Sequence, residues 1–146
     1  MENIFRHYKA NESLYTAIVN PVCEKHGLTY MEFTVLMFLS NNPSFDTASD
    51  VVKYRHLTKS HVSMSVRSLM EKGLLRGEHL GSDRRTIHLS VLEAAEKIVS
   101  DGREAQRAFG DVLFSGFSEA DYDLFTSFMK RIDENIKNHI EVVQKK

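Results

Sequence analysis

The feature that most constrains the fold is a change of hydrophobic period between residues 58 and 90. Four apolar residues recur at helical spacing in the first part of this segment: Val62, Val66, Leu69 and Met70. Gly73 then supplies a residue that easily adopts the left-handed conformation and ends a helix. Residues 81–83 form a turn signal, and residues 86–90 alternate between polar and apolar. The sequence therefore predicts an amphipathic helix followed directly by a two-stranded hairpin.

A second, shorter helix is predicted just before this one. Thr47 and Asp50 have the spacing of an N-terminal cap, and the helix that they open should run to about Tyr54. Only a tight break separates it from the helix that begins at Thr58, so the pair forms a helix-turn-helix. An isolated hairpin is marginally stable in water, and it should therefore pack on these helices as a wing.

Two helices are expected before this unit. The first covers residues 3 to about 20, and Pro21 should end or kink it because proline lacks a backbone donor. Gly27 fits a helix stop, and Thr29 should cap the second helix, which closes at residues 41–43. The buried face of the second helix is expected to consist of five residues: Tyr30, Phe33, Leu36, Met37 and Leu39.

Two longer helices are expected after the hairpin. Ser90 and Glu93 have the spacing of a capping box that opens a helix to about Phe114, and Ser118 and Asp121 should cap the last one. The last helix carries an apolar seam made of Phe125, Phe128, Met129, Ile132, Ile136 and Ile140. Such a seam is too apolar for a free terminal helix, so its burial in a dimer is expected. The predicted fold class is mainly α with a small β-hairpin wing (α+β).

Composition excludes several classes of protein. The 146 residues fit one domain, and the longest apolar run, residues 33–39, is far too short to cross a bilayer. The single cysteine, Cys23, excludes an internal disulfide framework and fits a reducing cytoplasm. Glycine-rich phosphate loops, nucleophile motifs and the His-Glu-x-x-His pattern do not occur in the sequence, which argues against an enzyme. We expect a cytoplasmic protein without a resident cofactor and without membrane association.

The distribution of charge points toward nucleic acid, although the net charge of −1 does not. Residues 53–88 carry eight Lys and Arg against three acidic residues, whereas the rest of the chain carries eleven basic and seventeen acidic residues. A local excess of positive charge is the electrostatic signature of a surface that binds phosphates. The alternative explanation of this charge excess is an ordinary solvated surface.

The candidate DNA-contacting residues lie on the outer side of the 58–72 helix and at the hairpin tip. A helix fits the major groove, its N-terminal N–H groups suit a phosphate, and an arginine at a wing tip suits the minor groove. The candidates are Thr58, Lys59, Ser60, His61, Ser63, Met64, Arg67, Arg84 and Arg85. Asp83 is better placed to fix the wing loop than to touch DNA. The alternative is that all of these residues are merely solvated.

Three motifs in this region resemble the multiple-antibiotic-resistance-regulator (MarR) family. They are Thr58-Lys59-Ser60-His61-Val62-Ser63, then Leu69-Met70-Glu71-Lys72-Gly73-Leu74-Leu75, and the wing sequence Asp83-Arg84-Arg85. With Gly27-Leu28-Thr29-Tyr30 opening a helix in the expected place, the resemblance spans nearly the whole of residues 1–146. It implies a DNA-binding region at 29–90, dimerisation helices at 1–26 and 91–146, and an obligate homodimer on a pseudo-palindromic operator. It also implies that a small aromatic or anionic effector releases the DNA.

Two other types of site were considered. Some members of the family sense hydroperoxides through a lone cysteine, but Cys23 lies only four residues before Gly27, which favours a role in helix packing. A branch of the family senses zinc, yet His26 near Cys23 and Glu24 is the nearest approach to a ligand set among the seven histidines. Five aromatic residues could line an effector pocket but are mostly expected in the core: Tyr8, Tyr15, Tyr30, Phe33 and Phe38.

The sequence thus predicts a dimeric, sequence-specific, ligand-responsive DNA-binding transcription regulator, most simply a repressor. The alternative is a winged-helix module that binds proteins and not DNA, which the near-neutral total charge would favour.

Overall fold

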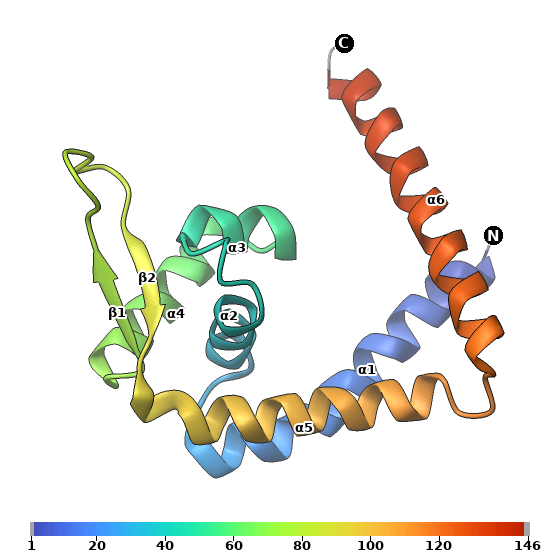
Figure 1. Ribbon diagram of the computed structural model, residues 1–146, viewed down its shortest axis with the longest axis horizontal. Helices are drawn as coiled ribbons and strands as arrows, with labels where there is room; N and C mark the ends of the chain where they lie inside the picture. Colours follow the sequence, from blue (N-terminus) through green and yellow to red (C-terminus); the bar gives the residue numbers. More distant parts are fainter. Residues whose placement is uncertain (1, 145–146) are drawn as a thin grey trace. The chain divides into compact units, whose positions relative to one another are not determined.

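A computed structural model describes residues 2–144, which form two compact units that meet at residues 109 and 110. The elements, in chain order (Figure 1), are α1 (Glu2–His26), α2 (Tyr30–Asn41), α3 (Ala48–Arg55), α4 (Lys59–Glu71), β1 (Leu75–Glu78), β2 (His88–Val91), η1 (Glu93–Ala95), α5 (Glu96–Leu113) and α6 (Glu119–Gln144). The predicted mainly α fold with a β-hairpin is confirmed. Within residues 2–144, no helix is both long and apolar enough to cross a membrane.

Helix α2 is the core of the first unit and contacts α1, α3, α4 and β2 (Figure 1). Thr29 caps it as predicted, in a capping box with Glu32. Its burial is wider than the predicted face, since Val35 and Phe38 are buried with Phe33, whereas Tyr30 is only half-buried. Contact with elements on several sides explains this, because a helix surrounded by other elements needs apolar residues all round.

Helices α3 and α4 form the predicted helix-turn-helix. The cap between Thr47 and Asp50 is confirmed, because each residue bonds the backbone N–H of the other. Of the apolar residues at helical spacing in α4, Val62 and Leu69 are 0% exposed, whereas Met70 is 41% exposed and lies at the edge of the apolar side. The methyl group of Met70 instead lies over β1, where Gly77 leaves it room.

The two strands pair antiparallel with Leu75 opposite Val91 and Glu78 opposite His88. Ser90 lies inside β2, so its prediction as the start of a capping box was wrong. The reason is that the buried neighbour Leu89 donates its N–H to the Asp46 carbonyl at 2.7 Å, which holds this segment as a strand. The following helix therefore begins later, with the turn η1 and then α5.

Helix α1 continues through Pro21 to His26, so the prediction that it ends near residue 20 was wrong. Val19 and Cys23 lie one turn apart on either side of Pro21 and are 0% and 4% exposed. Burial on both sides of the proline offsets the backbone hydrogen bond that proline removes. Gly27 ends the helix as predicted, with φ of +64°.

The second unit holds the end of α5 and all of α6. Ser118 and Asp121 cap α6 as predicted, and Phe114 packs against Phe117, Tyr122 and Phe125. The apolar seam along α6 is exposed in the single chain, at 39–50% for each of its six members.

Candidate nucleic-acid interface

The predicted contact residues lie on the outward side of α4 and at the hairpin tip. All nine candidates for DNA contact are exposed: Thr58, Lys59, Ser60, His61, Ser63, Met64, Arg67, Arg84 and Arg85. The first seven lie on or next to α4, whose inner side is anchored by Val62, Ser65 and Leu69. The helix is therefore held by its apolar side and presents hydroxyl, ammonium and guanidinium groups to the outside.

The N-terminus of α4 differs from those of α2 and α3. Those two helices have complete capping boxes, whereas the Thr58 hydroxyl makes no capping bond within residues 2–144. The first-turn N–H groups of α4 are thus left for another acceptor, and a phosphate oxygen is a suitable one. His56, with φ of 51°, is the left-handed C-cap that ends α3 two residues before Thr58.

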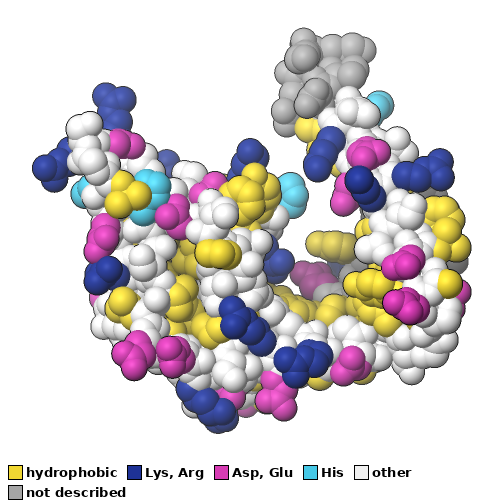
Figure 2. Space-filling view, in the orientation of Figure 1, with side chains coloured by type: hydrophobic (Ala, Val, Ile, Leu, Met, Phe, Trp, Pro, Cys, Tyr) yellow, Lys and Arg dark blue, Asp and Glu magenta, His cyan; other side chains and the backbone are white. Residues whose placement is uncertain are grey.

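The hairpin tip is a self-contained loop that carries two arginines. The Asp83 carboxylate accepts the N–H of Arg85 at 2.8 Å and the N–H of Thr86 at 3.4 Å, and these bonds hold the pKa of Asp83 below its usual value. His79 contacts the Thr86 carbonyl oxygen at 3.0 Å across the loop. Figure 2 shows Lys and Arg side chains projecting from this tip. Asp83 thus acts through backbone N–H groups, the kind of contact that the predicted wing-fixing role requires.

The base of the hairpin is attached to the helix-turn-helix by one residue that the sequence analysis did not single out. Asp46, just before α3, contacts His88 through its carboxylate at 2.8 Å and accepts the Leu89 N–H through its carbonyl. The wing and the helix-turn-helix are therefore held in one geometry. A lone aspartate before a cap gives no sequence signal for such a distant pairing.

A polar junction at the other end of α4 was also missed. Glu32 is 5% exposed and accepts hydrogen bonds from the Ser68 hydroxyl at 2.5 Å and from Lys72 Nζ at 2.8 Å. Its position three residues after Thr29 could have predicted the capping box, but nothing in the sequence predicts its two partners 36 and 40 residues away.

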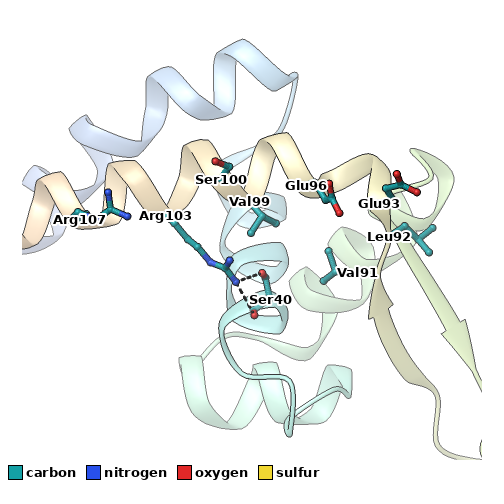
Figure 3. A pocket seen from close by; sticks show the side chains of 9 residues that line it. All are labelled: Ser40, Val91, Leu92, Glu93, Glu96, Val99, Ser100, Arg103 and Arg107. Carbon is teal, nitrogen blue, oxygen red and sulfur yellow. Dashed lines mark hydrogen bonds between the residues drawn. The ribbon is translucent and has the colours of Figure 1, made fainter.

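A cavity of about 480 Å³ lies beside α5, where α2 ends and the wing leads into α5 (Figure 3). Arg103 crosses it and donates to the Ser40 hydroxyl at 3.0 Å and to the Ser40 carbonyl at 3.3 Å. Arg107 lies one turn further along, Val91 and Val99 form apolar walls, and two glutamates lie toward the other end. The cavity therefore combines apolar walls with two guanidinium groups.

The residues that the sequence suggested for redox sensing, metal binding or effector binding have the following surroundings. Cys23 is buried in the core, as predicted for a packing role, and burial raises the pKa of its thiol. His26 contacts the Asp101 carboxylate, and no group of three or more potential metal ligands occurs among the residues described. Of the aromatic residues, Phe33 and Phe38 are in the core, Tyr8 is 69% exposed, and Tyr15 borders a cavity of only about 80 Å³.

Comparisons with known proteins agree with this geometry. Residues 26–86 match a family model of the MarR family. A MarR family transcriptional regulator from Listeria monocytogenes, solved with a 26mer DNA, is 19% identical and has a TM-score of 0.85 over 99% of this chain and 96% of its own. A MarR transcriptional regulator from Methanosarcina mazei is 18% identical, with a TM-score of 0.78 over 94% of this chain and 92% of its own.

A third solved structure is BpsR of Bordetella bronchiseptica, whose DNA binding is regulated by 6-hydroxynicotinic acid. It is 18% identical, with a TM-score of 0.69 over 90% of this chain and 98% of its own. Taken together, the MarR family model matches the helix-turn-helix and most of the wing, and the chain shares the fold of these regulators over nearly its full length.

Proposed function

We propose that this protein is a homodimeric transcription regulator that binds duplex DNA through α4 and the wing. The observation that carries the proposal is the pairing of an exposed polar face on α4 with an arginine-bearing wing fixed to the same unit through Asp46. In a helix-turn-helix protein this geometry places the second helix in the major groove, and a wing tip with two guanidiniums suits the neighbouring minor groove.

The dimer follows from α6. Its exposed seam of six large apolar residues is costly to leave in water, and a second copy with the same seam would cover it symmetrically. Two copies of α4 would then enter successive major grooves about one helical turn apart, on a pseudo-palindromic operator.

The test is the selection of bound duplexes from a random-sequence pool by the purified protein at moderate salt. We expect enrichment of a palindrome with half-sites about ten base pairs apart. If a folded, dimeric protein enriches no sequence and shows no salt-dependent binding to any duplex, the DNA-binding proposal fails. A protein-interaction module, which the net charge of −1 favours, would then be the better explanation.

Two arginines should separate base contacts from phosphate contacts. Arg67→Ala on α4 should change the base preference, with discrimination at one position falling by about 1–3 kcal/mol. Arg85→Ala at the wing should weaken binding to all sequences and reduce the dependence of affinity on salt by about one charge. An equal loss on operator and random duplex for Arg67→Ala would refute its base-reading role.

We further propose that a small aromatic or anionic effector controls DNA binding and occupies the cavity beside α5. Its volume of about 480 Å³ lies in the range of small-molecule sites, and Arg103 and Arg107 offer partners for a carboxylate. Titration with benzoate and related ring carboxylates, followed by calorimetry, tests this assignment. Arg107→Ala should abolish the heat of binding, whereas Arg84→Ala at the distant wing tip is the matched control. Unchanged heats in Arg107→Ala would place the effector elsewhere.

A further inference from the structure

Three helices meet at the buried carboxylate of Glu32. The residue lies in the first turn of α2, where its Oε2 accepts the Thr29 N–H at 2.8 Å and closes the capping box. The same oxygen accepts Lys72 Nζ at 2.8 Å, and Oε1 accepts the Ser68 hydroxyl. Lys72 also donates to the Gly27 carbonyl at the end of α1, at 3.1 Å. One side chain thus links the start of α2 with the C-terminal turn of α4 and, through Lys72, with the end of α1.

The negative charge of Glu32 requires its hydrogen-bond donors to lie at defined positions. A carboxylate that is 5% exposed cannot be solvated, so its bonding capacity must be filled by protein donors in fixed directions. Burial alone would raise the pKa of Glu32, but the hydrogen bonds from Lys72, Ser68 and Thr29 outweigh burial and hold the pKa below its usual value. The group is therefore ionised at neutral pH, with each oxygen directed to a donor on or beside α4.

The partners of Glu32 lie close to the exposed face of α4 in the sequence. Ser68 directly follows Arg67, and Lys72 is the C-terminal cap of the helix. The apolar contacts of Val62 and Leu69 hold α4 against the core, but apolar packing is non-directional and restricts rotation and sliding less than hydrogen bonds do. At this end of α4, Glu32 accepts the side-chain bonds of both Ser68 and Lys72, and Lys72 also donates to the Gly27 carbonyl.

We propose that Glu32 is a positioning residue for DNA recognition, whose buried carboxylate, through Ser68 and Lys72, sets the orientation in which α4 presents Arg67 and Ser63. The proposal rests on the DNA-binding function proposed above. A small rotation of α4 would displace its base-contacting side chains while leaving the positive charge of the surface in place. Loss of Glu32 should therefore impair binding to the operator more than binding to random DNA.

The experiment compares Glu32→Gln with Asp101→Asn as a matched control. The Asp101 carboxylate accepts bonds from Lys25, His26 and Lys97, so it joins α1 to α5 without a bond to α4. Both substitutions replace a multiply bonded carboxylate with an amide and change the net charge by the same amount. The readout is the ratio of operator affinity to random-duplex affinity at one salt concentration. The loss of one negative charge, by itself, should change both affinities alike and leave this ratio nearly unchanged.

We expect Glu32→Gln to lower this ratio about tenfold, comparable to the loss of one base contact, and Asp101→Asn to change it less than about twofold. Amide hydrogen exchange should rise in residues 66–72 of Glu32→Gln and not in those of Asp101→Asn. If Glu32→Gln fails to fold, Ser68→Ala removes the α4 donor without a charge change and should lower the ratio in the same direction.

Two results would overturn the proposal. If the ratio falls equally in Glu32→Gln and Asp101→Asn, or in neither, Glu32 is only a stabilising residue, although wild-type enrichment of a palindrome would still support the proposed function. If the wild-type protein binds no duplex, both the function and the positioning role fail.

Discussion

Two glycines of α5 should respond in opposite ways to the same substitution. A Cβ on Gly102 would lie 2.6 Å from Met37 Sδ and 3.0 Å from Phe33 Cε2, and these neighbours are 2% and 0% exposed. A Cβ on Gly110 would meet no atom within 4 Å among the residues described. Alanine in place of glycine in a helix gains about 1 kcal/mol in the interior and less near an end. Overpacking a tight core costs about 1–3 kcal/mol.

Gly102→Ala should therefore lower the free energy of unfolding by about 1–2 kcal/mol, because two buried side chains of α2 must move. Gly110→Ala should raise it by about 0.5–1 kcal/mol. Urea unfolding of both variants and the wild type, at one protein concentration, measures the difference, which we expect to be roughly 2 kcal/mol. A Gly102→Ala variant as stable as Gly110→Ala would refute the close packing of α5 on α2.

Three further predictions concern α4, the wing and the response to acid. Gly77→Ala should shift the wing and weaken DNA binding in a duplex titration, because the new Cβ would lie 2.8 Å from Ile87 Cγ2. Leu69→Ala should lower the free energy of unfolding by about 2–5 kcal/mol in urea, since the side chain is 0% exposed. The pKa of Glu32 is lowered in the folded state, so its contribution to stability is present above its ordinary pKa of 4.5 and is lost as pH falls below that value. Thermal unfolding of Glu32→Gln should accordingly depend less on pH between about 5 and 3 than that of the wild type; an identical pH dependence would contradict this.

The elements that the sequence predicted correctly depend on short-range chemistry. The Thr47 and Ser118 caps and the left-handed Gly27 and Gly73 are each decided by a few neighbouring residues, and each has the predicted geometry. The change from period 3.6 to period 2 at Gly73 likewise placed the wing after α4. The sequence predicted an element correctly where only neighbouring residues decide its conformation.

The errors arose where distant contacts decide the outcome. Pro21 lies inside α1 because the burial of Val19 and Cys23 overrides a local helix breaker. Ser90 lies in a strand because Asp46, 44 positions earlier in the chain, holds its neighbour. The partners of Glu32 were not predictable for the same reason, because the residues around a helix cap do not indicate which distant side chains contact it. The roles of the α4 and wing residues in DNA contact remain predictions.

The hairpin is held in two separate places, its base and its tip, and this separation allows the tip residues to vary. Asp46 holds the base of the wing, while the nine-residue loop 79–87 is closed by its own bonds, those of Asp83 and His79. Ser82 and Arg84, which are exposed and take no part in these bonds, can therefore be exchanged without changing a contact of the core. Under the proposed function, the number of positive charges at the tip, and with it the affinity for DNA of any sequence, can therefore change at little cost in stability.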